Sequence, residues 1–243
     1  MAIIRNLAAL MLVLPLLGCG GAANRALPLE PTLIMAQPLA RTAERPPPFA
    51  RRIAQSNTTV GGGIAGMLIG AAVTATINND ERQRSRIGEV PSPAGVDPGA
   101  IIEAMIGDHL INNFAARPYV GSLSAGSVRE TASFERAEQV AALARRRGLS
   151  GLVIDVVALE FYADSTGRNL GLVDEAFSVV VTAQLTLIDV ATGTIVASGG
   201  CKGKNRNTQA IQNAVDDGAR LTTLLAQKAA ANCATQLIEN ILQ

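Results

Sequence analysis

The strongest constraint on the fold of this chain is a strict alternation of apolar residues over residues 177–188. Every second side chain in this stretch is apolar, and most of the positions between them hold Ser, Thr or Gln. A strand has a side-chain period of two, so the pattern predicts an antiparallel strand with one buried face. Residues 189–193 follow as a hairpin turn, and residues 194–198 are expected to return beside the strand.

The residues around this hairpin are expected to complete an α+β domain over residues 97–243. Asp97 and Pro98 are typical of the N-cap and the first residue of a helix. This helix is expected to end near residue 117. After it, a short strand at 119–123, a helix at 134–147 and a strand at 152–161 are expected. A helical region at 207–242, with a break at Asp217 and Gly218, is expected to close the domain. This order predicts a small mixed, largely antiparallel sheet with helices packed on one face.

The N-terminus has the pattern of a secretory signal peptide over residues 1–18. Arg5 carries a positive charge, and the apolar run of about 11 residues that follows is too short to span a bilayer core of roughly 30 Å. The run ends in Leu16-Leu17-Gly18-Cys19, which resembles the lipobox of bacterial lipoproteins. The resemblance implies cleavage between Gly18 and Cys19 and covalent lipid on the Cys19 thiol, with no other cofactor expected.

Lipid on Cys19 would anchor the protein to a membrane without a spanning helix. Gly20 follows the cysteine, where an aspartate would resemble an inner-membrane retention signal. The expected location is therefore the outer membrane, facing the periplasm. The alternative is an ordinary secretory signal with a chance cysteine at its cleavage site.

The segment after the anchor is divided into a tether and an apolar stretch. Residues 19–58 are rich in proline and predict an extended, lipidated tether. Residues 59–77 carry no charge, and Gly62, Gly66 and Gly70 recur every four residues, which places them on one stripe of a helix.

This glycine stripe resembles the glycine-zipper segments of outer-membrane lipoproteins, including the conjugative surface-exclusion (TraT-type) proteins. The resemblance implies self-association or membrane insertion. A buried Gly/Ala-rich helix or a flexible linker is the alternative. Residues 78–96 are expected to link this segment to the folded domain.

The chain contains three cysteines, which fits an oxidising compartment. With Cys19 lipidated, Cys201 and Cys233 are expected to form a disulfide, whose loop would contribute roughly 3–4 kcal/mol of stability. Two reactive or metal-binding thiols are the alternative, but no histidine or second cysteine pair lies near them in the sequence.

The composition excludes some partners. Lys and Arg total 21 against 20 Asp and Glu, so no strongly basic field selects nucleic acid. The expected partners are the membrane, through the acyl chains, and envelope proteins, with further copies of the same chain among them. Aromatic residues make up only 3% of the chain, so the core must be aliphatic.

No motif indicates a catalytic or metal site. His109 is the only histidine and is expected to be a packed or surface residue on a helix. Residues 121–126 lack the spacing of a nucleophile elbow, and residues 198–205 lack that of a phosphate-binding loop and are interpreted as a polar strand-to-helix connection. The acidic residues between 155 and 175 lack the ligand spacing of a metal site. We therefore expect no enzyme activity and no metal.

Residues 187–193 carry a family resemblance. A strand that ends L-x-D-x-x-T-G and turns into its partner resembles the periplasmic α/β domains of the curli-secretion lipoprotein, the penicillin-binding-protein activator lipoprotein and the TolB N-terminal domain. The resemblance extends over residues 98–243 as a pattern. Together, the anchor, the glycine stripe and this domain predict a non-enzymatic, lipid-anchored structural or assembly component of an envelope complex, which acts through the α/β domain and glycine-zipper self-association. The alternative is a regulatory binding module for a peptidoglycan synthase or the cell wall.

Overall fold

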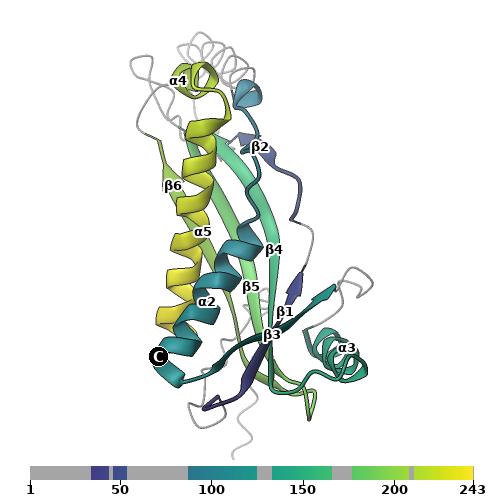
Figure 1. The fold of residues 1–243 in the computed structure, drawn as a ribbon. Coiled ribbons are helices and arrows are strands. Elements are labelled where there is room, and N and C mark those ends of the chain that lie inside the picture. The colour runs from purple at the N-terminus through teal and green to yellow at the C-terminus, as the bar shows by residue number, and fades with distance from the viewer. Residues whose placement is uncertain are drawn as a thin grey trace, which may run out of the picture.

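The computed structural model describes residues 34–43, 46–53, 87–124, 133–165, 177–207 and 211–242. These ranges form one mixed sheet with helices packed against it (Figure 1). The signal peptide, the lipidation site at Cys19 and the glycine stripe of Gly62, Gly66 and Gly70 lie outside the described residues, so they stay predictions.

The sheet has six strands in the order β3-β1-β4-β5-β6, and β2 also pairs with β4. β1 is parallel to both of its neighbours, β2 is parallel to β4, and the pairs β4–β5 and β5–β6 are antiparallel. The strands are β1 (Pro38–Ala43), β2 (Ala50–Ile53), β3 (Arg117–Ser124), β4 (Leu152–Ser165), β5 (Phe177–Asp189) and β6 (Ile195–Arg206).

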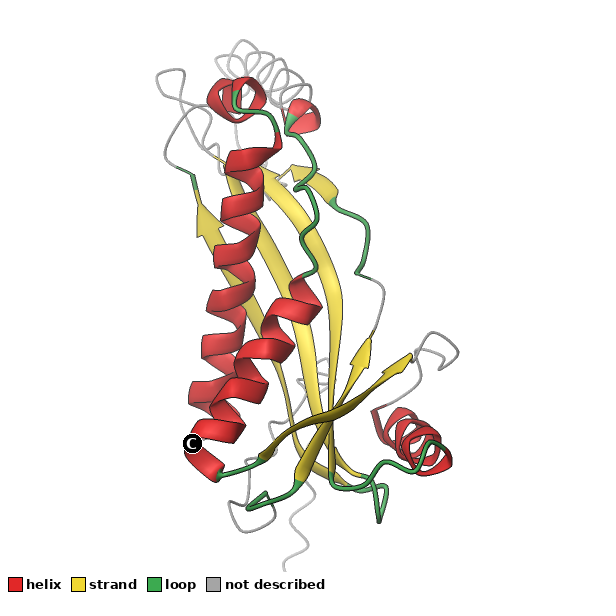
Figure 2. Cartoon of the chain, in the orientation of Figure 1, coloured by secondary structure: helices red, strands yellow, loops and turns green. Residues whose placement is uncertain are grey.

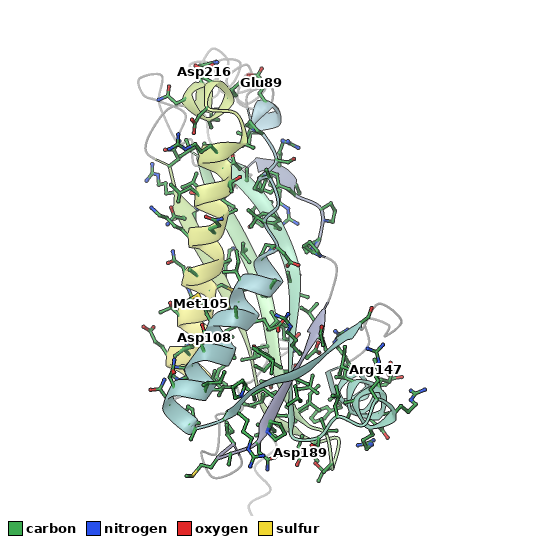
Figure 3. The ribbon with its side chains drawn as sticks, viewed as in Figure 1. Glu89, Met105, Asp108, Arg147, Asp189 and Asp216 are labelled. Atoms are coloured by element: carbon green, nitrogen blue, oxygen red, sulfur yellow. A yellow bond between two sulfur atoms is a disulfide. The ribbon has the colours of Figure 1, made fainter. Side chains whose placement is uncertain are left out.

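The alternation that opens the sequence analysis corresponds to β5. Its apolar set faces the main core, and Asp189 closes the hairpin by accepting a 2.7 Å hydrogen bond from the backbone N–H of Ala191. Gly193 has φ of 75°, the left-handed conformation that favours glycine in such a turn. Figure 3 shows Asp189 at one end of the molecule and Asp216 at the other.

The strand after the hairpin is longer than expected, because β6 continues through residues 198–206. The interpretation of this stretch as a strand-to-helix connection is therefore wrong. Residues 199–204 consist mostly of glycine and lysine, which are poor strand formers, so the sequence pattern did not predict a strand there. At Gly203 the missing side chain has a packing role: a Cβ there would meet the Ala229 carbonyl and the backbone of Cys233.

Two helices cover one face of the sheet and confirm the expected fold class (Figure 2). They are α2 (Pro98–Phe114) and α5 (Ala219–Ile241), and the short α4 (Ile211–Asp216) precedes α5. As expected, the Asp97 side chain caps α2 by accepting a 3.1 Å hydrogen bond from Ala100 N. The expected break before α5 falls at Gly218, which has φ of 63°.

A third helix adds a smaller contact on the opposite face of the sheet. α3 (Ser133–Arg146) packs its alanines and Val140 against Val153 of β4 and Ile188 of β5. The neighbouring residues Leu152 and Leu187 point into the main core instead. Because successive strand residues face opposite sides, the two cores lie on opposite faces of the sheet.

The expected tether includes two strands of the sheet. Residues 38–43 form β1, in which Leu39 and Ala40 are fully buried, and residues 50–53 form β2. The domain boundary expected at residue 97 therefore differs from the structure, in which residues 38–43 and 50–53 belong to the sheet. β1 has only six residues and lies between prolines, so its sequence shows no local pattern typical of a strand. Its partners are supplied by residues far along the chain.

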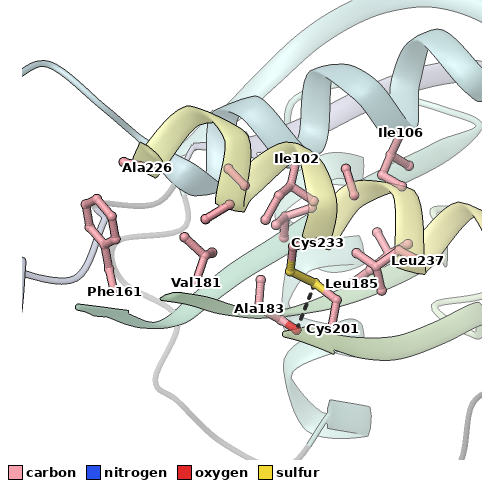
Figure 4. Packing of buried hydrophobic residues seen from close by; sticks show 14 of the residues in the cluster. Ile102, Ile106, Phe161, Val181, Ala183, Leu185, Cys201, Ala226, Cys233 and Leu237 are labelled. Carbon is pink, nitrogen blue, oxygen red and sulfur yellow. Dashed lines mark hydrogen bonds between the residues drawn. A yellow bond between two sulfur atoms is a disulfide. The ribbon is translucent and has the colours of Figure 1, made fainter. Parts of the chain in front are cut away.

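The expected disulfide joins Cys201 of β6 to Cys233 of α5, with their Cα atoms 5.1 Å apart. It lies within the main core, near Ala183 and Leu237 (Figure 4). The bond links the C-terminal helix covalently to the sheet that it covers.

Among the residues that the structure describes, no helix is long and apolar enough to cross a membrane.

Candidate functional site

The most distinctive polar feature lies where β1 and β2 separate along β4. β1 pairs with residues 152–154 of β4, and β2 pairs with residues 162–165. The proline run at residues 46–48 lies between these two paired stretches. Because proline has no backbone N–H, it is poorly suited to continue a ladder.

A cavity of about 160 Å³ opens at this interruption. Its wall combines the end of β1, the first turns of α2 and the middle of β4. The residues that give it its chemistry are Arg41, Thr42, Asp97, Glu103, Ser122 and Val156.

Glu103 of α2 is the buried ionisable group of this cavity. It is only 5% exposed, and its Oε1 atom has no hydrogen-bond partner among the described residues. Arg41 Nε lies 3.6 Å from Oε1, which is an ion-pair distance but too long for a hydrogen bond. Burial raises the pKa of the Glu103 carboxyl from 4.5 to about 7; the Arg41 charge lowers it, and the Asp97 and Asp155 charges raise it.

Small residues on α2 make room around Glu103. Gly99 and Gly107 lie four positions before and after it, so all three share one stripe of the helix. A Cβ at Gly107 would collide with the ring and hydroxyl of Tyr119. The Tyr119 hydroxyl donates a 3.1 Å hydrogen bond to the Glu103 carbonyl, and Arg41 lies over the Tyr119 ring at 5.3 Å.

A second buried carboxylate beside the cavity is fully engaged. Arg136 of α3 makes two hydrogen bonds to Asp155 of β4, at 2.6 Å from Nε and 2.9 Å from Nη2. The Thr42 hydroxyl donates to the same carboxylate at 2.8 Å. Asp155 is thus paired and hydrogen-bonded, as buried charges usually are, whereas Glu103 has the 3.6 Å ion pair with Arg41 but no hydrogen bond to its Oε1 atom.

β2 is fastened to β4 by a partly exposed ion pair. Arg52 donates a 2.8 Å hydrogen bond to Glu160 and lies over the Tyr162 ring at 4.2 Å. Thr182 of β5 also donates to Glu160, at 3.2 Å. The hydrogen bond from Arg52 lowers the pKa of the Glu160 carboxyl. These contacts close the far side of the interruption between β1 and β2.

Comparisons with known proteins give no family. Neither a family model nor a curated protein matches the chain. Among solved structures, a PelC variant from Paraburkholderia phytofirmans, crystallised as a dodecamer, is similar with 15% identity, covering 84% of this chain and 88% of that chain at a TM-score of 0.29.

Two further solved structures are similar at the same low level. Lipoprotein GNA1162 from Neisseria meningitidis shares 13% identity over 80% of this chain and 99% of its own, at a TM-score of 0.26. A candidate lipoprotein from Caulobacter crescentus CB15 shares 22% identity over 45% of this chain and 86% of its own, at a TM-score of 0.22. TM-scores this low establish neither a shared fold nor a shared function. The resemblance to the curli-secretion, activator and TolB domains stays a prediction.

Of the residues singled out from the sequence, Asp97 and Ser122 line the cavity, and His109 and Lys202 lie elsewhere. His109 contacts the C-terminal end of α5, with Nε2 3.1 Å from the Leu242 carbonyl, which agrees with a packed residue. Lys202 is on the exposed side of β6, where the Gln236 amide of α5 contacts both its N–H and its carbonyl at 3.2 Å. Within the described ranges, no group of three His, Cys, Asp or Glu residues could hold a metal.

Sequence reasoning missed Arg41, Thr42 and Glu103. One usable signal was present, because Glu103 adjoins the apolar face of α2 and has glycine four positions away on each side. A charged residue between two such glycines indicates a helix stripe that another segment approaches closely. No local pattern identifies Arg41 and Thr42, which lie among residues interpreted as tether.

Proposed function

We propose that the chain is a non-enzymatic, lipid-anchored cell-envelope protein that acts as a structural or assembly component of an envelope complex. The observation that carries the proposal is the disulfide between Cys201 and Cys233, which leaves Cys19 as the only remaining cysteine of three. Structural disulfides are typical of compartments outside the cytoplasm. This supports export by the N-terminal signal and lipid attachment at Cys19.

The position of β1 supports an assembly role close to the membrane. Ile34 is fully buried and follows Cys19 by 15 positions (34 minus 19). Fifteen residues reach at most about 50 Å when fully extended. An anchored domain would therefore stay near the bilayer and meet partners there, instead of hanging from a tether of some 40 residues.

Metabolic labelling with palmitate in a Gram-negative host tests the anchor. The full chain should take up label and sediment with the outer membrane, and Cys19→Ser should abolish both. Cys201→Ser combined with Cys233→Ser is the matched control, which should keep its label. Label that persists in Cys19→Ser, or loss of label only in the control, would contradict the proposal.

The second candidate, a binding module for a peptidoglycan synthase or the cell wall, is favoured by the cavity at Glu103. Sedimentation of the full chain with purified sacculi tests this candidate. Retention that Glu103→Gln weakens and Glu138→Gln leaves unchanged would support it. Absence of the full chain from the sacculus pellet would count against direct wall binding.

A further inference from the structure

We infer that the cavity at Glu103 is a binding site for a primary ammonium group. The inference does not depend on the lipid anchor or on an assembly role. It rests on the buried oxygen of Glu103, the charges of the lining and the size of the cavity.

The first argument is the hydrogen-bonding state of Glu103. Its Oε1 atom is buried in the wall of an open cavity without a hydrogen-bond partner among the described residues. An ionised carboxylate only accepts hydrogen bonds, so a group that completes this site must donate one. Leaving such an oxygen unpaired costs more than leaving a neutral acceptor unpaired. An ammonium group offers three N–H donors together with the opposite charge.

The second argument is the sign of the charge around the cavity. Asp97 and Glu103 supply two carboxylates, and Arg41 supplies one cation whose side chain is 46% exposed. Asp155 is paired with Arg136 behind the wall. The lining therefore favours a cation over an anion. The N-terminus of α2 does not reverse this preference, because Asp97 already caps it.

The third argument concerns which cation fits. The cavity volume of about 160 Å³ is far above the roughly 10–15 Å³ that one water requires. Val156, Ala158 and Pro46 supply an apolar wall along which the methylenes of an alkylammonium can lie. A divalent metal fits less well, since it would meet only two lining carboxylates and the Arg41 guanidinium.

The test is calorimetric titration of the full chain in neutral detergent at pH 8, where Glu103 is mostly ionised and alkylamines are protonated. The probe is n-butylammonium, and we expect millimolar binding. Titration with Nα-acetyl-lysine methylamide tests whether the bound ammonium group belongs to a lysine side chain. Quaternary n-butyltrimethylammonium has the same charge but no N–H donor, so it should bind at least about tenfold more weakly.

Variants separate binding from folding. Glu103→Gln should weaken n-butylammonium binding at least about tenfold while its thermal midpoint at pH 8 rises, a combination that misfolding does not produce. Glu138→Gln, on the exposed side of α3, should bind like the unaltered chain.

Three results would overturn the inference. One is the absence of any n-butylammonium heat in the unaltered chain, and another is equal binding of the quaternary ion. The third is unchanged binding in Glu103→Gln. The lysine derivative distinguishes two sources of the bound ammonium group. If it binds no better than n-butylammonium, the natural ligand is a free amine and not the lysine side chain of another protein or peptide.

Discussion

Arg41 Nε and Glu103 Oε1 are 3.6 Å apart, close enough for their charges to interact but too far for a hydrogen bond. The carboxyl is therefore desolvated without full compensation, and its pKa rises from 4.5 to about 7. β1 and α2 thus meet at a group that binds a proton more tightly in the folded chain than in the unfolded one.

The first prediction concerns stability against pH. Below pH 4.5, Glu103 is protonated in both states and has no effect. Between pH 4.5 and about 7, the unfolded chain releases the proton first, so the Glu103 contribution to the free energy of unfolding falls as pH rises. The total loss is about 3 kcal/mol, since one pKa unit corresponds to about 1.4 kcal/mol.

Urea unfolding of the full chain at pH 5 and pH 8 measures this effect. Glu103→Gln should remove most of the loss and so be the more stable protein at pH 8. Glu138→Gln should keep the pH dependence of the unaltered chain. Equal pH profiles for Glu103→Gln and the unaltered chain would contradict the assignment.

The second prediction concerns the buried pair of Arg136 and Asp155. Asp155→Ala removes the carboxylate that accepts two hydrogen bonds from Arg136 and one from Thr42, and should cost about 3–5 kcal/mol of unfolding free energy. Adding Arg136→Met should recover part of that loss, because the buried cation that Asp155 balanced is then removed as well. Chemical denaturation of the two single variants and the double variant gives the coupling energy.

The exposed pair of Arg52 and Glu160 is the control for this measurement. Its removal by Glu160→Gln should cost less than about 1 kcal/mol, because exposed pairs are screened by solvent. Strictly additive losses for Arg136→Met and Asp155→Ala would show that the buried pair is not coupled.

The third prediction concerns the crossing of α5 over β6. Gly203→Ala places a Cβ against the Ala229 carbonyl and the Cys233 backbone, which must shift. We expect a loss of about 1–3 kcal/mol in thermal or urea unfolding. Gly200→Ala is the control on the same strand, since its nearest contact would be an ordinary 3.7 Å to the Ala183 carbonyl. Similar losses in both variants would refute the close approach at Gly203.

The fourth prediction concerns the glycine stripe, which lies outside the described residues. If Gly62, Gly66 and Gly70 mediate self-association, Gly66→Leu should lower the mass of the detergent-solubilised protein in light scattering after size exclusion. Gly61→Leu, which such a helix would carry on the opposite side from the stripe, should not. If the unaltered chain and both variants all have the mass of a monomer, the zipper hypothesis is wrong.

The sequence predicted the elements with strong local periodicity. β5 and its hairpin follow from the alternation and the turn residues, and the break at Gly218 follows from glycine in a helical region. β1 was missed because its partners in β3 and β4 lie far along the chain. The second half of β6 was missed because its glycines are poor strand formers, and one of them, Gly203, serves packing against α5. Both are non-local effects, which a local pattern does not carry.

The cavity escaped sequence analysis for the same reason. Thr42 and Asp155, which share a hydrogen bond, are 113 positions apart. Glu103 meets Arg41 only after β1 has taken its place in the sheet. By contrast, Cys201 and Cys233 could be paired from the sequence, because only two cysteines remain once Cys19 is assigned to the lipid.

The interior position of β1 also bears on how the molecule would respond to force. β1 is hydrogen-bonded on both sides, to β3 and to β4, and among the described residues it is the strand nearest to Cys19 in the sequence. A pull on the N-terminus along this strand loads both ladders in shear at once, so that many hydrogen bonds must break together. Tension between a membrane and a partner would then be carried by the sheet itself.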